Sequence, residues 1–422
     1  MIAVIIFIVL LLISTPIAAA LGLTSIYAVV QSGDSLDNVA RTMFSGIDSF
    51  SLMAIPFFIF AGDLMLAGGT SKRLIDMAKK LVGWTTGGLP IAGVLSSMFF
   101  AALSGSSPAT VAAIGGIMIP SLREAHYSPK FSAGLMCAAG SLGIIIPPSI
   151  TLLVYGVIAE VSISELFMAG IIPGVVIGIS LIVVSYIIAK SQGHQPEAKA
   201  SLNEVLTSSK EAVWGIMMPV IVLGGIYFGV FTPTEAAAVA IVYSWFVGFF
   251  IYKELSIKKL FEVTKRSVVI ASMVMLVISS AQVFSWYLTR QQIPNQLAEQ
   301  ILAFAESPIV IMLLITLVLL IVGMFMDPSA AVLVMAPLFL PIVIDLGISP
   351  IHFGIIMIVN LAIGMLTPPF GLNLFVASGI SKLPLTSVIN GTLPFVVVLI
   401  VMLLLITFVP QLSLFIPEIL YN

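Results

Sequence analysis

Long apolar segments, separated by short polar breaks, cover most of the chain. A helix needs about 20 apolar residues to cross a bilayer, and segments of this kind recur from end to end. We expect ten crossing helices, over residues 2–14, 16–33, 49–68, 129–160, 165–189, 212–231, 233–252, 267–289, 351–380 and 385–409. The pattern therefore predicts an all-α polytopic membrane protein.

Two further apolar regions, 88–122 and 308–344, are interrupted in the middle. Each arm is shorter than the roughly 20 residues that a crossing requires. We therefore expect two re-entrant helical hairpins, each entering and leaving the membrane on one side. The segments 71–84 and 292–306, which precede the hairpins, mix charged and apolar residues at helical spacing. We interpret them as helices in the membrane interface, with ordinary loops as the alternative.

Composition supports a membrane protein, because 60% of the residues are hydrophobic, 9% are charged and the mean hydropathy is +1.20. The net charge of −2 gives a nucleic-acid partner no electrostatic support. The single cysteine, Cys137, excludes an internal disulfide, and three scattered histidines show no metal-ligand spacing. The first 22 residues resemble a signal peptide but have no Lys or Arg before the apolar core, so we interpret them as a retained first helix.

Basic residues gather in the loops that this topology places on one side. With the N-terminus outside, fifteen of the 17 Lys and Arg residues fall inside, as the positive-inside rule requires. Only Arg41 and Arg290 fall outside. Both termini are thus predicted to lie outside, although this count does not distinguish a re-entrant hairpin from a pair of full crossings.

The chain contains an internal repeat. A shift of 220 or 221 residues matches prolines and glycines of the two hairpin regions and places Pro147-Pro148 on Pro368-Pro369. Glycine and proline dictate backbone shape, so these matches indicate two structurally equivalent halves. The predicted organisation is a first repeat at 1–190, an inner linker at 191–211, a second repeat at 212–409 and an outer tail at 410–422.

The predicted repeats are inverted, because five crossings, an odd number, separate equivalent points of the two halves. Inverted repeats with interrupted helices at matching positions are typical of secondary transporters. Their binding site lies at the interface of the repeats, near the midplane of the membrane. The alternative is a duplicated scaffold without transport.

Four interruptions are predicted to break helices at membrane depth, at 104–107, 143–151, 327–329 and 364–373. Two of them contain Pro-Pro, which removes two N–H donors and frees the carbonyls one turn earlier. Unpaired backbone at this depth must face protein, water or an ion. Freed carbonyls and nearby hydroxyls suit a hard cation such as Na⁺, so we expect two related cation sites, each at a hairpin tip and its partnered broken helix.

The candidate cation ligands are side-chain and backbone oxygens at these breaks. They belong to Ser104, Ser106, Ser107, Gly143, Ile146 and Ser149 in the first half and to Asp327, Ser329, Gly364, Leu366 and Thr367 in the second. Asp327 is the sharpest candidate, because an ionisable group in the membrane is usually functional. It also has a compatible structural interpretation as the N-cap of a helix beginning at Pro328, and capping is the alternative for Ser106 and Ser107 as well.

The candidate substrate contacts are Ser107, Thr110, Thr151 and Asn373. Helix N-termini near Pro108 and Pro328 would attract a substrate carboxylate. No buried Arg or Lys is expected beside the substrate, so hydroxyl and N–H groups would carry recognition. Asp63 is interpreted as structural, and no organic cofactor is expected.

Other functions are less well supported. No P-loop appears, so ATP-driven transport is not expected. An intramembrane hydrolase would need a His or Lys to activate Ser106, and neither stands in the serine-bearing breaks, so we do not expect an enzyme. A cation/proton antiporter or a channel on the same inverted fold is the main alternative to an importer.

With both hairpins and both Pro-Pro breaks considered, the chain resembles the large membrane subunit of the tripartite ATP-independent periplasmic (TRAP) transporters. The motifs SGSSPATVAAIG, GIIIPPSI, FMDPSAAVLV and GMLTPPFGLNLFV look like that family's hairpin and broken-helix motifs, which are specific in combination. The resemblance runs over essentially all 422 residues. It implies Na⁺-driven uptake of an organic acid anion across the bacterial inner membrane by an elevator mechanism, in which the hairpins and broken helices move as one domain.

The resemblance also implies partners and an orientation. We expect a small membrane subunit of four helices, as a separate chain because this chain begins at the large subunit's first helix, and a soluble periplasmic substrate-binding protein. Both termini would then be periplasmic. Sialic acid is the expected substrate and a C4-dicarboxylate the next. Arg290 is interpreted as an interfacial anchor or as a contact for the binding protein.

Overall fold

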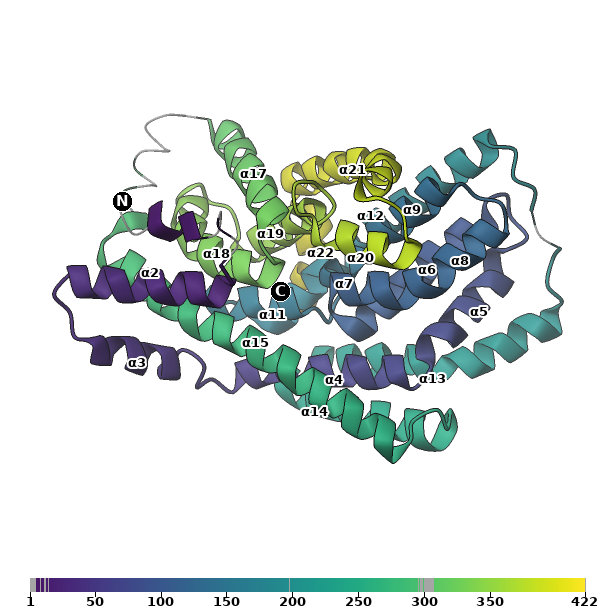
Figure 1. The fold of residues 1–422 in the computed structure, drawn as a ribbon, viewed down its shortest axis with the longest axis horizontal. Helices are drawn as coiled ribbons and strands as arrows, with labels where there is room; N and C mark the ends of the chain where they lie inside the picture. The colour runs from purple at the N-terminus through teal and green to yellow at the C-terminus, as the bar shows by residue number, and fades with distance from the viewer. Residues whose placement is uncertain are drawn as a thin grey trace.

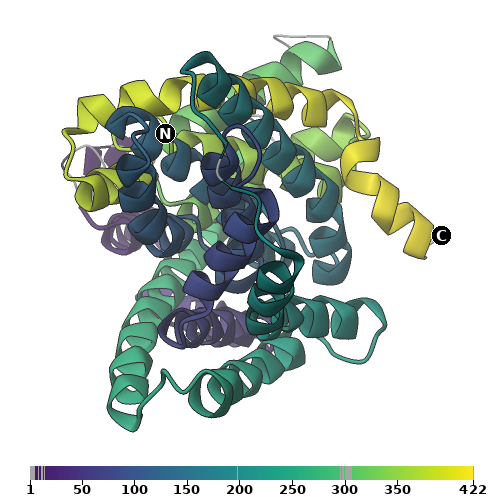
Figure 2. The ribbon, with the colours of Figure 1, turned by 90° about the vertical axis from the view of Figure 1, so that its right-hand side faces the viewer.

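The computed structural model describes residues 5–421 apart from 8, 11, 12, 14, 197, 295, 297, 298 and 300–306. The regular elements in this part of the chain are all helices. They form two layers, which can be followed in Figure 1 and, after a quarter turn, in Figure 2. We call these layers the base layer and the core bundle.

The base layer lies along the lower edge of Figure 1. It consists of α2 (Ile17–Gln31), α3 (Leu36–Ser45), α4 (Ala54–Ala67), α13 (Leu202–Tyr227), α14 (Pro233–Phe246) and α15 (Ile257–Arg290), with a short 3₁₀ helix at Ser51–Met53 and a π-helical stretch at Val247–Ile251. The long α15 packs along α2 and α4, and α14 packs on α4 and α13. Arg290 at the end of α15 pairs with Asp34, beyond α2, with 2.8 Å between Nη2 and Oδ1.

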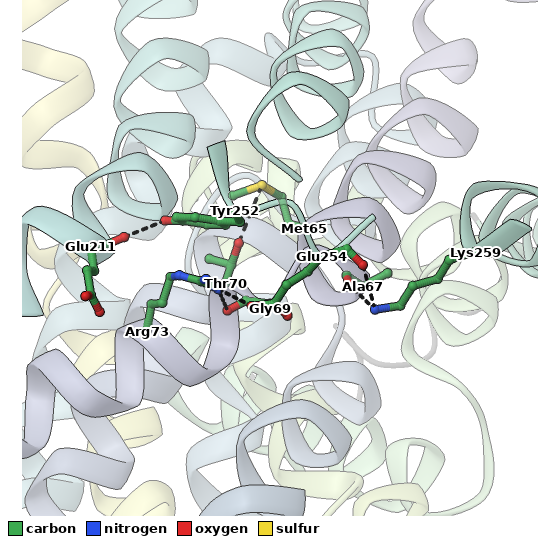
Figure 3. Close-up of polar contacts among 9 residues, drawn as sticks. All are labelled: Met65, Ala67, Gly69, Thr70, Arg73, Glu211, Tyr252, Glu254 and Lys259. Carbon is green, nitrogen blue, oxygen red and sulfur yellow. Dashed lines mark hydrogen bonds and ion pairs between the residues drawn. The ribbon is translucent and has the colours of Figure 1, made fainter. Parts of the chain in front are cut away.

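Helix α5 (Thr70–Val82) leaves α4 at an angle of 65° and carries the chain toward the core bundle. Figure 3 shows how this corner is held: Arg73 Nη1 donates to the Gly69 carbonyl at 2.9 Å and to Glu254 Oε1 at 2.6 Å. The Arg73 guanidinium carbon also lies 3.8 Å from the centre of the Tyr252 ring. Gly69 has a φ of +84°, and a Cβ there would overlap the Glu254 carboxylate, so the corner requires glycine.

The core bundle contains both hairpin regions and both broken helices. The first half supplies α6 (Gly88–Ser104), α7 (Ser107–Thr110), a π-helical stretch (Val111–Gly115), α8 (Gly116–Glu124), α9 (Pro129–Gly140), α10 (Leu142–Ile145), α11 (Ile150–Ile158) and α12 (Ile163–Ser191). The second half supplies α17 (Pro308–Phe325), α18 (Pro328–Asp345), α19 (Pro350–Gly364), α20 (Leu372–Ser381), α21 (Leu385–Phe408) and α22 (Gln411–Tyr421). Buried side chains of these helices form one apolar core that continues into the base layer.

The four predicted helix breaks are present. The residues between consecutive helices are 105–106, 146–149, 326–327 and 365–371. By length and composition, eight of the described helices could cross a membrane, or nine if α4 and α5 form one bent span. Both arms of the second hairpin region, α17 and α18, are among the eight, so the re-entrant path stays a prediction.

Several helices extend beyond the predicted spans. Helix α13 begins at Leu202, inside the polar linker 191–211, because Ser201 and Glu204 form a capping box there. Residues of the predicted tail form α22, which packs on α12. The predicted interface segment 71–84 corresponds to α5, whereas the segment 292–306 and the first span, 2–14, lie largely outside the described residues.

Candidate functional site

A cavity of about 190 Å³ lies between the base layer and the core bundle. Helices α4 and α15 line it on one side, and both hairpin tips and residues around the first helix break line it on the other. The residues predicted to bind ions or substrate that line it are Ser104, Ser106, Thr151, Asp327 and Ser329. Tips from the two halves of the sequence repeat therefore meet at one place, although they are far apart in the chain.

Hydroxyl groups close the first hairpin tip. The hydroxyl oxygens of Ser104 and Thr110 are 2.8 Å apart, and they lie 3.2 and 2.9 Å from the Ser106 carbonyl oxygen. Gly105 ends α6 with a φ of +59°, and its carbonyl accepts a hydrogen bond from the Ile150 N–H at 3.3 Å. The tip is thus joined to the start of α11, on the far side of the first helix break.

The first broken helix places its backbone directly against this tip. A Cβ at Gly143 would lie 2.6 Å from the Thr110 hydroxyl oxygen and closer still to the Ser106 carbonyl oxygen. Glycine is therefore what permits the contact. Gly143 belongs to the predicted cation ligands, and the structure brings its backbone to the same tip as the predicted serines.

The first break itself is partly closed by a side chain. Ser149 Oγ donates to the Ile144 carbonyl at 2.7 Å and caps α11 by accepting a backbone N–H at 3.3 Å. One of the carbonyls before the Pro-Pro pair is thus paired within the protein. Ile146, the last residue before the prolines, is extended and half-buried.

Asp327 occupies the second hairpin tip as the N-cap of α18. Its Oδ1 accepts a hydrogen bond from the Ser329 N–H at 2.9 Å, which confirms the predicted capping role. The Asp327 side chain is also exposed on the cavity wall, and Ser329 is half-buried on the same wall. The same carboxylate can therefore cap the helix and face a cation in the cavity.

The second break reaches the cavity through Met365. The Thr367 hydroxyl donates to the Ile363 carbonyl at 2.9 Å, and the Thr367 N–H donates to the Gly364 carbonyl at 3.0 Å. Gly364 lets α19 approach α17, because a Cβ there would lie 2.8 Å from the Gly323 carbonyl oxygen. None of Gly364, Leu366 and Thr367 lines the cavity.

At the breaks, a helix of each half packs against the hairpin region of the other half. Helix α20, after the second break, packs on α7 of the first hairpin region, and α11, after the first break, packs on α18 of the second. Asn373 Nδ2 on α20 donates to Ser107 Oγ at 2.7 Å and to the Cys137 carbonyl at 3.3 Å. Each hairpin tip therefore contacts the broken helices of both halves, not of its own half alone.

Three predicted substrate contacts lie behind the cavity wall. Ser107, Thr110 and Asn373 are buried and do not line the cavity, whereas Thr151 does. The buried Asn373 Oδ1 has no hydrogen-bond partner among the residues that the structure describes. The amide nitrogen of the same group is held by Ser107 Oγ at 2.7 Å, so the unpaired oxygen is a further candidate ligand for a cation at the first tip.

Two charged residues of the base layer were not expected at the site. Asp63 on α4 and Arg266 on α15 both line the cavity. Asp63 Oδ2 accepts a hydrogen bond from Ser267 Oγ at 2.7 Å, which agrees with a structural role. Arg266 directly precedes the predicted span 267–289, but α15 begins at Ile257, so Arg266 lies well inside the helix. Arg266 is exposed, so the expectation that no buried Arg or Lys lies beside the substrate stays a prediction.

The comparisons with known proteins agree on one family. A family model described as "Tripartite ATP-independent periplasmic transporter, DctM component" matches residues 4–412. The chain is 46% identical over 400 residues to the C4-dicarboxylate TRAP transporter large permease protein DctM of Pseudomonas aeruginosa, with 94% of each chain covered. It is 39% identical over 392 residues to the sialic acid TRAP transporter large permease protein SiaM of Vibrio cholerae, with 93% of this chain and 92% of the relative covered.

The fold is also similar to a solved structure. The crystal structure of the YdaH transporter of Alcanivorax borkumensis matches with a TM-score of 0.63 and 16% identity, and the match covers 88% of each chain. At this identity the likeness concerns the fold alone. Together with the sequence matches, it agrees with an all-helical transporter architecture.

Proposed function

The chain belongs to the family of the DctM component of tripartite ATP-independent periplasmic transporters, and from this premise we propose that it imports an organic acid anion together with Na⁺. Membership makes the chain a multi-pass membrane permease and not an enzyme. The observation that carries the proposal is the cavity at which both hairpin tips meet. Serine and threonine hydroxyls, two carboxylates and one guanidinium line that cavity, which is the mixture that an anion and a hard cation need together.

We place two coupled cations at the two tips. Ser104, Ser106 and Gly143 supply oxygens near the first, and Asp327 and Ser329 supply them near the second. Moving one positive charge down a 100 mV potential yields about 2.3 kcal/mol, so two net charges supply roughly 5 kcal/mol, or several thousandfold accumulation. Among the described residues, no three His, Cys, Asp or Glu side chains gather as metal ligands, so the oxygens of the tips are the natural candidates.

The substrate that we propose is an organic acid with at least one carboxylate. Sialic acid was favoured by resemblance, and one relative carries the name of a sialic acid permease. The higher identity to a permease named for C4-dicarboxylates favours that class, so both acids belong in the first test. Hydroxyls at Ser104, Ser106 and Thr151 provide hydrogen bonds for either anion.

The partners and the movement follow from the family. TRAP large permeases work with a small membrane subunit and a periplasmic binding protein, and we propose that this chain does the same in a bacterial inner membrane. We also propose that the core bundle moves against the base layer as an elevator. The cavity supports this idea, because one wall belongs to each layer and a substrate between them would be released when the layers move.

The experiment that tests the proposal is uptake into proteoliposomes. The chain is reconstituted with its small subunit and binding protein, and accumulation of radiolabelled sialic acid and succinate is measured with and without an inward Na⁺ gradient. We expect one acid to accumulate only when Na⁺ and the binding protein are both present.

Two results would contradict the proposal in different ways. Accumulation that needs no Na⁺ gradient would remove Na⁺ as the coupling ion. Substrate-independent Na⁺ flux in liposomes containing this chain would favour the channel or antiporter instead of the importer.

A further inference from the structure

Among the residues that the structure describes, Arg266 is the basic side chain on the cavity wall, and it is exposed. Among the described residues, its guanidinium makes no ion pair, hydrogen bond or aromatic contact. By contrast, Arg73 and Arg290 are both paired with carboxylates. A guanidinium carries five N–H donors in a fixed fork, and without a partner in a concave site it is ready for an anion.

The acidic groups on the same wall do not satisfy Arg266. Asp63 lies on the neighbouring α4, but its Oδ2 accepts from Ser267 Oγ, and no Asp63 to Arg266 ion pair forms within 4.0 Å. Asp327 is occupied as the N-cap of α18. The apolar side chains of Ile270 and Val274 follow on α15 and line the same cavity.

Resting on the proposed function, we infer that Arg266 binds a carboxylate of the transported anion and is the residue that selects carboxylate-bearing substrates. A planar guanidinium matches a carboxylate in a two-point contact, which gives geometric selectivity as well as affinity. The anion then spans the cavity, with a carboxylate on Arg266 of the base layer and its other polar groups on the hydroxyls of the hairpin tips.

The position of Arg266 gives this contact a particular consequence. Its helix, α15, belongs to the base layer, whereas the hydroxyls of Ser104, Ser106 and Ser329 belong to the core bundle. A substrate held from both sides loses the Arg266 contact when the two layers move. Arg266 therefore acts in the conformation described here and sets substrate affinity in that state.

The test compares Arg266→Gln and Arg266→Lys with Lys265→Gln in the reconstituted complex. Lys265 is the preceding residue on α15, is exposed and does not line the cavity, so its replacement removes the same charge from the same helix. A charge-assisted hydrogen bond contributes about 1.5–3 kcal/mol, so we expect the apparent KM of Arg266→Gln to rise roughly ten- to a hundredfold. Arg266→Lys should fall between it and the wild type, and Lys265→Gln should match the wild type.

A competition assay separates binding from a merely structural role. Uptake of the labelled acid is inhibited with the unlabelled acid and with its amide, which lacks the charge. The wild type should prefer the acid, and Arg266→Gln should lose most of that preference. A lower maximal rate with unchanged KM and unchanged preference would show a structural role and overturn the inference.

The proposed function and this inference fail in distinguishable ways. A wild-type complex that accumulates none of the tested acids overturns the transport proposal, and the role of Arg266 falls with it. Wild-type uptake together with a KM for Arg266→Gln within twofold of that for Lys265→Gln overturns the inference alone. If Arg266→Gln does not assemble, Arg266→Lys is measured in the same competition assay. A preference for acid over amide equal to that of the wild type would contradict the two-point contact, because lysine cannot form it.

Discussion

At the scale of single residues, Asp327 has two roles that one substitution separates. Its Oδ1 caps α18 through the Ser329 N–H, and its carboxylate lines the cavity. Asparagine caps a helix about as well as aspartate but carries no charge. Alanine also carries no charge, and it cannot cap the helix. We therefore predict that Asp327→Asn retains stability and raises the half-saturating Na⁺ concentration roughly tenfold, equivalent to about 1.4 kcal/mol. Uptake measured against Na⁺ concentration checks this.

The stability of the same variants isolates the cap. Asp327→Ala should lower the free energy of unfolding by about 1 kcal/mol more than Asp327→Asn, because it also loses the cap. Asp345→Asn, at the other end of α18 and exposed, is the matched control and should behave as the wild type. Na⁺ activation that is the same in all three variants would remove Asp327 from the cation site.

Gly143 yields a second prediction at this scale. An added Cβ would meet the Thr110 hydroxyl oxygen at 2.6 Å, so Gly143→Ala must push the first hairpin tip away from the broken helix. Overpacking of this kind costs about 1–3 kcal/mol, and we expect both a lower melting temperature and a large loss of uptake. Gly116→Ala in α8 is the control, because nothing lies within 4 Å of its Cβ position. Equal behaviour of the two variants would mean that the tip tolerates displacement.

Residue identities at the tips could be predicted because their signals are local. Asp before Pro328 and serines before Pro108 favour the start of a helix, and the structure places Asp327, Ser104 and Ser106 on one cavity. Their partners could not be predicted in this way. Asn373 bonds Ser107 across 266 positions of sequence, and a spacing pattern carries no information about such a contact. Arg266 was missed because its surroundings depend on α4 and both tips.

At the scale of elements, the corner between α4 and α5 depends on an ion pair that can be measured. The Arg73 and Glu254 side chains are 20% and 41% exposed, so solvent screens part of their attraction. We predict a coupling energy of about 0.5–1 kcal/mol from a double-mutant cycle with Arg73→Gln and Glu254→Gln, followed by thermal unfolding in detergent. The coupling should weaken as salt is added.

A second ion pair serves as the control for this corner. Lys80 and Glu204 also join α5 to another helix, but their side chains are 43% and 51% exposed and 3.1 Å apart. The greater exposure predicts a smaller coupling energy in the same type of cycle. A larger coupling for this pair than for Arg73 and Glu254 would contradict the view that the corner is the better-held contact.

Helix breaks were easier to predict than helix ends. Proline and glycine act on their own backbone, so all four breaks appear where the sequence places them. The start of α13 at Leu202 depends on the Ser201 and Glu204 capping box within a polar stretch, and hydropathy alone assigns such a stretch to a linker. The sequence predicted a tail over residues 410–422, but α22 is a helix there and packs on α12.

At the scale of the whole molecule, the sequence repeat predicted equivalent halves but not how they interlock. Matching prolines place an interrupted apolar region and a broken helix in each half, and the helix breaks of both are found, whereas the re-entrant path stays a prediction. The exchange of α11 and α20 between the halves is a property of the three-dimensional packing, because each helix contacts the other half's hairpin region. The interlocking is what the proposed elevator requires of the core bundle, because its two halves would have to move together against the base layer.

Movement between the layers can be tested with a reversible disulfide. A Cβ at Gly62 on α4 would lie 3.3 Å from the Ser104 Cα on α6, so the two helices approach closely enough for cysteines at these positions to be tested for a bond. In a Cys137→Ala background, which removes the single native cysteine, Gly62→Cys with Ser104→Cys should transport less when oxidised than when reduced, because the bond ties the core bundle to the base layer. The reduced form of the same variant is the baseline, because Ser104→Cys also removes a proposed cation ligand. Gly68→Cys with Gly248→Cys joins two parts of the base layer, so its oxidation should leave uptake unchanged. Undiminished uptake by a fully crosslinked 62–104 pair would rule out an elevator movement of the first hairpin past α4.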